Sequence, residues 1–180
     1  MTTWSGTFPL PPAALSPNAQ THPQTARKAE AAYKKQCIAV WDTCPIRRAT
    51  HVTLSMAWFC IRNVELKAKP NAKGVVTKTA KGMEPYCPRD VGNAWGAAKY
   101  LIDAMCDQYD EVWELTSTKP QRRVLVSKTL SRDGIIKDDR AEWFSGGPCK
   151  VYGTVKSRKM GHTKGCIEVF LEIEEDLQLG

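Results

Sequence analysis

The sequence has little of what the common catalytic and nucleotide-binding motifs require. It contains three histidines, and none stands in an order that suggests a Ser-His-Asp triad, which argues against a triad hydrolase. Neither G-x-G-x-x-G nor G-x-x-x-x-G-K-[ST] occurs, so we expect no nucleotide cofactor. The longest apolar run, 54–61, is too short to span a membrane. Residues 1–6 show no basic segment that leads into an apolar stretch, so we expect a cytoplasmic protein.

The seven cysteines lack the spacing of a zinc site or a disulfide framework. No C-x-x-C occurs, and Cys37, Cys44 and His51 do not have the spacing of a zinc knuckle. An odd number cannot all pair within one chain, and nothing predicts a secretory context. We therefore predict reduced, partly buried thiols, with a redox or zinc role as the alternative.

Positive charge is in excess and is unevenly distributed. Lysine and arginine number 26 against 19 acidic residues, which gives a formal net charge of +7. Such an excess favours a polyanionic partner, nucleic acid first and an acidic membrane surface second. The stretch 168–176 is acidic, so the positive charge is concentrated elsewhere, notably in 67–89 and 156–165. We interpret 67–89 as a basic loop and 156–165 as a basic hairpin connection.

Hydrophobic periodicity predicts helices and strands in the order of an α+β fold. Apolar residues recur at helical spacing in 25–41 and 93–105, the second helix being capped by Asn93 or preceded by a turn at Asp90. Alternation predicts strands over 52–59 and 167–173, with further strands at 124–126 and 151–155. Four prolines make the first twenty residues an extended or turn-rich lead-in. We expect one domain over 1–180, in which two main helices pack on a small, mostly antiparallel sheet.

Two acidic clusters are candidates for chemistry. Asp90 precedes the second helix, on which Lys99 and Asp103 share one face because they are four residues apart. The pair Asp138 and Asp139 ends a short apolar run. Carboxylates brought together from separate elements repel unless a proton or a cation lies between them, and hard oxygen ligands suit Mg²⁺. The alternative is a cap, a surface ion pair and an exposed turn.

Four segments, in this order, resemble the RusA family of Holliday-junction resolvases, including its phage-encoded members. Segment 8–18 is similar to the family's proline-rich first strand and the turn after it, and 89–93 with Lys99 and Asp103 is similar to its R-D-x-D-N…K-x-x-x-D helix. Segment 134–139 resembles its G-x-x-x-D-D turn, and 159–165 its closing hairpin. The chain departs from the family at Gly92, which replaces the second acidic residue, and at Lys99, which lies three residues later than usual. Residues 106–133 look like an insertion.

The resemblance implies a RusA-like homodimer that resolves four-way DNA junctions by paired, Mg²⁺-dependent phosphodiester hydrolysis, with Mn²⁺ as a substitute ion. It implies Asp90, Asp139 and Lys99 as catalytic residues and Asp90, Asp103, Asp138 and Asp139 as metal ligands, with Asp103 or Asp138 in the place left by Gly92. Phosphate-binding residues would be Arg89, Lys156, Arg158, Lys159 and Lys164. The alternatives are a non-catalytic protein that binds branched DNA on the same scaffold, which Gly92 favours, and a basic interaction protein with no role on DNA.

Overall fold

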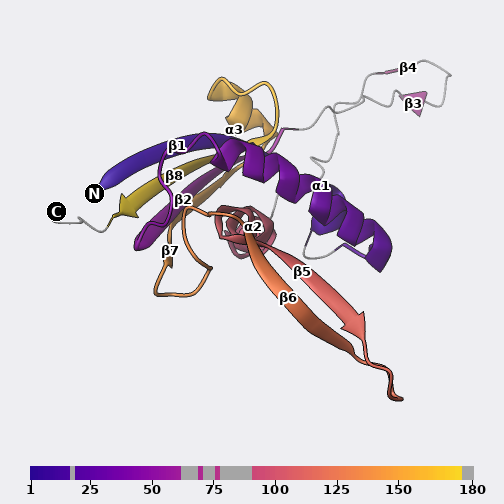
Figure 1. Cartoon of the computed structure of the whole chain (residues 1–180). Coiled ribbons are helices and arrows are strands. Elements are labelled where there is room, and N and C mark those ends of the chain that lie inside the picture. The colour runs from indigo at the N-terminus through magenta and orange to yellow at the C-terminus, as the bar shows by residue number, and fades with distance from the viewer. Residues whose placement is uncertain (17–18, 62–68, 71–75, 78–90, 176–180) are drawn as a thin grey trace.

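The computed structural model describes residues 1–16, 19–61, 69–70, 76–77 and 91–175. Within those ranges no helix is long and apolar enough to cross a membrane. Figure 1 shows the elements, which in chain order are β1 (Thr2–Pro9), the 3₁₀ turn η1 (Ala13–Leu15), α1 (Pro23–Trp41), β2 (His51–Phe59), β3 (Lys69–Pro70), β4 (Val76–Thr77), α2 (Val91–Met105), β5 (Gln108–Leu115), β6 (Arg123–Arg132), β7 (Phe144–Tyr152), α3 (Thr154–Lys159) and β8 (Cys166–Glu174).

Four strands form one sheet in the order β1-β8-β2-β7. β8 runs antiparallel to both β1 and β2, whereas β2 and β7 are parallel. The strands β3 and β4, and the strands β5 and β6, form two separate antiparallel pairs. The predicted α+β class is therefore confirmed, and two of the three pairings in the main sheet are antiparallel.

The central strands β2 and β8 alternate between buried and more exposed side chains as their sequences predict. In β2 the buried residues include Val52, Leu54 and Trp58, and in β8 they include Ile167 and Leu171. Successive side chains of a strand point to opposite faces, so one face of the sheet carries the core.

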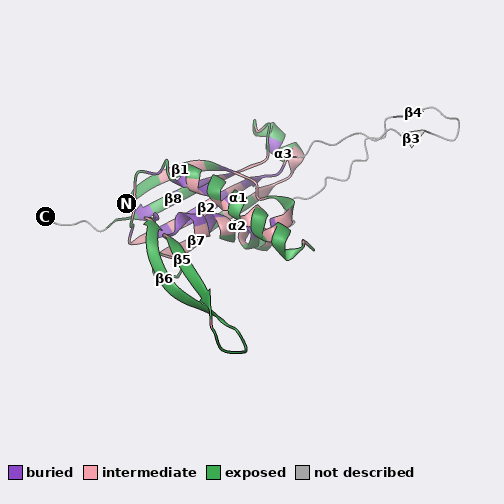
Figure 2. Cartoon of the chain, turned by 45° about the vertical axis from the view of Figure 1, so that its right-hand side comes forward, coloured by how far each residue is buried: buried purple, intermediate pink, exposed green. Residues whose placement is uncertain are grey.

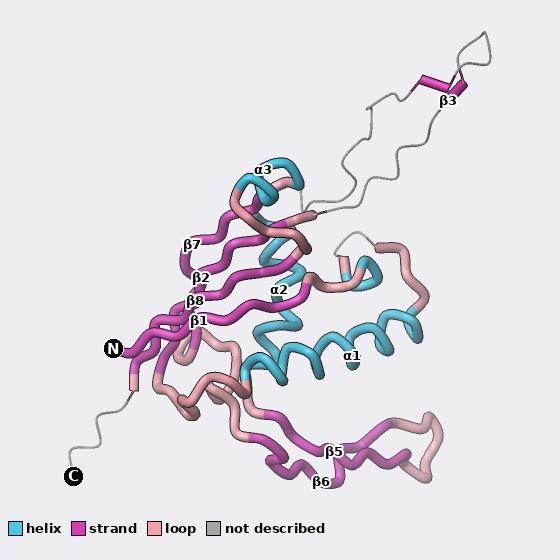
Figure 3. The backbone as a smooth tube through the Cα atoms, turned by 90° about the horizontal axis from the view of Figure 1, so that it is seen from above, coloured by secondary structure: helices cyan, strands magenta, loops and turns pink. Residues whose placement is uncertain are grey.

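The two long helices cover that apolar face. α1 contacts β1, α2 contacts β7, and the helices contact each other, as Figure 3 shows from above. Residues at helical spacing are buried on each helix, among them Cys37 and Trp41 on α1 and Leu101 and Met105 on α2. The indole nitrogen of Trp41 donates a 2.9 Å hydrogen bond to the carbonyl of Leu101, which ties the helices together.

Several details of the predicted elements are wrong. The predicted strand 151–155 is the end of β7, which begins at Phe144, and α3 begins at Thr154. β7 and β8 pair with opposite edges of β2, so the segment between them contains a short helix and is not a hairpin connection. α2 begins at Val91, so Asn93 lies inside the helix and does not cap it. The short strand at 124–126 belongs to the longer β6. The basic loop 67–89 lies outside the described residues except for β3 and β4.

Candidate functional site

The segment that follows β6 is held against the end of α2. The amide of Ile135 donates to the carbonyl of Met105 at 2.9 Å, and the amide of Asp107 donates to the carbonyl of Ile136 at 3.1 Å. On the other side, the amide of Ala49 donates to the carbonyl of Ile135 at 2.7 Å. Ile135 and Ile136 are fully buried. The segment therefore passes between the end of α2 and the start of β2, and it carries Asp138 and Asp139 to this end of the helix.

Asp107 fixes the start of this segment. Its side chain has no exposed surface, accepts a 2.8 Å hydrogen bond from the amide of Gly134 and forms an ion pair with Arg48. Arg48 also pairs with Asp133 at 3.1 Å. A side chain at Gly134 would collide with the backbone of Cys106 and Asp107, so this close approach requires glycine. Sequence reasoning gave Asp107 no role, because only the fold shows that it is buried against a distant turn.

Asp103 of α2 and Asp139 of the segment after β6 lie close enough for their charges to interact. Burial raises the pKa of the half-buried Asp103, Lys34 on α1 lowers it, and the negative charges of Asp139 and Glu30 raise it again. Lys99, one turn earlier on α2, also lowers this pKa. Two predicted ligands from distant segments thus share one electrostatic environment, which two lysines partly neutralise.

The thiol of Cys106 reports the same concentration of negative charge. Burial raises its pKa to about 12, and the charges of Asp139, Asp103, Asp138 and Asp107 all act in the same direction. Cys106 directly follows the last residue of α2, where the helix dipole is also negative. We refer to Asp103, Asp107, Asp138 and Asp139 as the acidic cluster. Its location favours a cation at the C-terminal end of α2.

Within the acidic cluster, Asp138 is already paired. Its two carboxylate oxygens accept hydrogen bonds from the Nε of Arg140 at 2.9 and 3.0 Å, and one of them accepts from Nη2 at 2.5 Å. These bonds lower the pKa of Asp138. Asp139 is exposed, and it is the member of the pair whose charge acts on Asp103. Asp103 and Asp139 are therefore better placed to act together than Asp103 and Asp138.

Of the other predicted site residues on or just before α2, only Lys99 lies among the described residues. Lys99 is exposed, and its Nζ lies 4.7 Å from the centroid of the Tyr100 ring. Asp90 and Arg89 lie outside the described residues. α2 begins at Val91 and rises about 1.5 Å per residue, which puts its first residue about 18 Å from Asp103 along the axis. The Asp103–Asp139 pair thus lies at the far end of the helix from its start.

A metal ion held by the described residues would have few protein ligands. Among them, no group of three histidine, cysteine, aspartate or glutamate side chains is arranged to hold a metal ion. Mg²⁺, however, is often bound by one or two carboxylates, while waters and substrate phosphates complete its coordination. Asp103 and Asp139 provide two hard oxygen donors whose mutual repulsion a cation would relieve. In donor chemistry, the pair suits Mg²⁺ bound in that way.

The predicted phosphate-binding residues lie on another part of the domain. Lys156, Arg158 and Lys159 are exposed on α3, and Lys164 is exposed in the loop that follows. The hydroxyl of Ser157 donates to the carbonyl of Tyr152 at 3.1 Å and holds α3 at the end of β7. Figures 1 and 3 both place α3 and the β5–β6 hairpin at opposite ends of the domain. This basic surface is therefore well separated from the base of the hairpin, where the acidic cluster lies.

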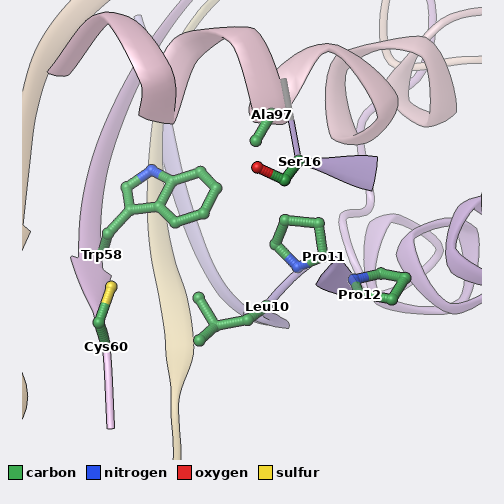
Figure 4. A pocket seen from close by; sticks show the side chains of 7 residues that line it. All are labelled: Leu10, Pro11, Pro12, Ser16, Trp58, Cys60 and Ala97. Carbon is green, nitrogen blue, oxygen red and sulfur yellow. The ribbon is translucent and has the colours of Figure 1, made fainter. Parts of the chain in front are cut away.

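A small cavity between the lead-in and β2 offers little chemistry. Its volume is about 50 Å³, and it is lined mainly by apolar groups; Figure 4 shows Ala97 of α2, the hydroxyl of Ser16 and the indole of Trp58 around it. The indole nitrogen of Trp58 is buried and has no hydrogen-bond partner among the described residues. One N–H and one hydroxyl are too few to hold a phosphate or a metal ion, so we do not place the functional site here.

Comparisons with protein families, with curated proteins and with solved structures found no match to this chain.

Proposed function

We propose that this chain is a metal-dependent, structure-selective endodeoxyribonuclease that resolves four-way DNA junctions. The observation that carries the proposal is the proximity of Asp103 and Asp139, which come from two segments that resemble separate motifs of the RusA family. Their charges interact although the β5–β6 hairpin separates them in the sequence. The acidic cluster, an exposed lysine on the same helix face and a basic surface elsewhere are the parts that such an enzyme needs.

We assign Asp103 and Asp139 as the residues that would hold Mg²⁺, or Mn²⁺ in its place. The ion would supply a water of lowered pKa and would stabilise negative charge on the scissile phosphate. Lys99 and Lys34, which both act electrostatically on Asp103, would attract that phosphate and stabilise its charge in the transition state. Asp138 would hold the turn through Arg140. Asp90 remains a ligand predicted by the resemblance alone.

The basic residues of α3 and Lys164 would bind backbone phosphates away from the cleaved bond. Such contacts give affinity and orientation but carry no sequence information. A homodimer would place two active sites on opposite strands of a junction, since a two-fold axis relates the two copies.

The second candidate is a protein that binds branched DNA without cutting it. Gly92 favours it, because it stands where the family that this segment resembles has its second acidic residue. Its basic surface would keep its affinity for DNA, because phosphate binding does not depend on the acidic cluster.

The test is cleavage of a synthetic four-way junction beside a linear duplex, with Mg²⁺, Mn²⁺ or EDTA. We expect paired, metal-dependent nicks in the junction, and a loss of at least about 100-fold in Asp103→Asn and Asp139→Asn with junction binding retained. The control is Asp133→Asn, an exposed aspartate outside the acidic cluster, which should cut normally. Asp90→Asn tests the remaining ligand separately. Tight junction binding without nicks under any metal condition would select the non-catalytic alternative.

A further inference from the structure

The hairpin formed by β5 and β6 projects from the domain and exposes an unusual amount of apolar surface. Figures 1 and 2 show it extending into solvent, with exposed residues along almost its whole length. The described part of the chain has thirteen exposed large hydrophobic side chains, and eight of them lie on this hairpin. They are Tyr109, Val112, Trp113, Leu115, Val124, Leu125, Val126 and Leu130.

Five of these side chains share one face of the hairpin, which we call the apolar face. Tyr109 pairs with Leu130, Trp113 pairs with Leu125, and Leu115 follows two positions after Trp113. Since side chains alternate along a strand and cross-strand partners share a face, these five lie together. Three charged residues flank them on the same face, as their contacts demonstrate. Trp113 donates to Glu111 at 3.1 Å, Arg123 lies 5.4 Å from the Trp113 ring, and Lys128 lies 4.3 Å from the Tyr109 ring.

An uncovered hairpin of this kind needs a partner. Two strands alone are marginally stable in water, and a contiguous apolar patch on a soluble protein usually marks a contact surface. The hairpin is tied to the domain at its base, where Arg132 donates to Asp42 at 2.6 Å and to the carbonyl of Ala104 at 3.3 Å. Beyond the base, its contacts are chiefly between its own two strands.

The charges on the two strands are self-complementary. On the apolar face, β5 carries Glu111 and no basic residue, whereas β6 carries Arg123 and Lys128 and no acidic one. Two hairpins that pack face to face about a two-fold axis along their length place the acidic strand of each copy over the basic strand of the other. DNA does not fit this face as well, because the face is largely apolar.

We infer that the apolar face of the β5–β6 hairpin is a self-association surface, through which two copies of this chain pack hairpin to hairpin. The inference rests on the proposed function only in expecting two copies related by a two-fold axis. It adds the surface through which the two copies bind. The hairpin follows α2 and precedes the segment that carries Asp139. Joining two hairpins at their apolar faces would therefore also fix the relative positions of the two acidic clusters.

The first test measures the mass of the full chain by light scattering and sedimentation over a dilution series. We expect a dimer of about 40 kDa, twice the 20.1 kDa of one chain. Leu125→Glu buries an unpaired carboxylate at the centre of the contact and should weaken the dimer at least about 100-fold. The matched control is Val155→Glu on α3, which is also exposed and should remain dimeric. Circular dichroism and thermal melting verify that each variant is folded.

The second test uses charge reversal and does not depend on any single variant. Glu111 and Lys128 form an ion pair at 3.6 Å within one hairpin. Glu111→Lys and Lys128→Glu each place like charges both within the hairpin and across the two-fold contact, so each variant alone should be mainly monomeric. An equimolar mixture should form the dimer again, because the two hairpins are then oppositely charged.

The inference is overturned if the wild-type chain is monomeric throughout, if Leu125→Glu dimerises as well as the wild type, or if the mixture does not restore the dimer. It is also overturned if the wild type is monomeric and Leu125→Glu loses affinity for a fluorescent junction, which would make the hairpin a DNA-binding arm. Hairpin-dependent dimers that do not cut DNA would contradict the proposed function alone, and a monomer that resolves junctions would contradict this inference alone.

Discussion

Asp107 connects the end of α2 to the turn that begins at Gly134. Its fully buried side chain accepts a hydrogen bond from the Gly134 amide and pairs with Arg48, whose own side chain is about half exposed. The carboxylate therefore joins three segments: α2, the connection between α1 and β2, and the turn that leads to Asp139. Because the position of Asp139 depends on this turn, Asp107 acts as a positioning residue for the candidate site.

Replacing Asp107 should destabilise the fold. Asp107→Ala leaves Arg48 without its buried partner and leaves the Gly134 amide without an acceptor, and we expect a loss of about 2 kcal/mol in the free energy of unfolding. This value lies below that of a fully buried pair, because solvent reaches Arg48. The matched control is Asp133→Ala, which removes the exposed partner of the same arginine and should cost less than about 0.5 kcal/mol. Urea denaturation measures both, and equal losses would contradict the role given to Asp107.

The raised pKa of Asp103 predicts a dependence of stability on pH. Burial and the charge of Asp139 raise the pKa of Asp103 in the folded state above its ordinary value. The folded chain therefore binds this proton more tightly than the unfolded chain, and stability decreases as pH rises from the ordinary value through the raised one. In EDTA, Asp103→Asn should be more stable than the wild type at pH 7, by less than about 1 kcal/mol because solvent screens a half-buried group.

This gain should disappear below about pH 4, where an ordinary aspartate is protonated in both states. At pH 7, adding Mg²⁺ should stabilise the wild type and leave Asp103→Asn unchanged, since only the wild type keeps both carboxylates. Asp110→Asn, an exposed carboxylate on β5, is the control and should show neither effect. Urea denaturation curves at both pH values decide the matter, and a variant less stable than the wild type at pH 7 would contradict the prediction.

At the scale of elements, the sequence predicts best where one face of an element is buried. β8 alternates throughout, and β2 alternates as far as Trp58, because both lie inside the sheet with helices over one face. The apolar stripe from Ala94 to Met105 is buried as its spacing predicts, and Lys99 and Asp103 do share a face. Local periodicity reflects burial directly. The sequence therefore predicts these elements and the part of the candidate site that lies on α2.

Elements without such a face were harder to predict. β7 is an edge strand that contains Gly146, Gly147 and Pro148, residues that usually interrupt a strand. A side chain at Gly147 would collide with Ser55, where the pairing between β7 and β2 shifts register. The glycine that makes β7 hard to predict therefore lets β7 lie close to β2. The hairpin carries apolar residues on both faces and shows no clear alternation. The approach of Asp139 to Asp103 depends on contacts across that hairpin's base, which spacing alone does not reveal.

On the scale of the whole molecule, the charge is divided between two ends. The acidic cluster lies at the end of α2, and α3 carries the basic residues Lys156, Arg158 and Lys159. Figures 1 and 3 place α3 and the β5–β6 hairpin at opposite ends of the domain. A net charge of +7 alone would attract DNA to any part of the surface. For the proposed nuclease we expect DNA to bind through α3, since the acidic cluster repels phosphate unless a cation is bound there.

This division predicts which lysines determine the salt dependence of DNA binding. Each phosphate that a protein neutralises on duplex DNA contributes about 0.9 to the slope of log affinity against log salt. Replacing Lys156 and Lys159 together by alanine should therefore lower the slope for a junction by about 1.8, without affecting the order of preference among sequences. The control replaces Arg27 and Lys28, two exposed cations near the start of α1, and should leave the slope nearly unchanged. Fluorescence anisotropy titrations at several salt concentrations measure both slopes. Equal reductions in the two variants would mean that the protein binds DNA through its overall charge rather than through α3.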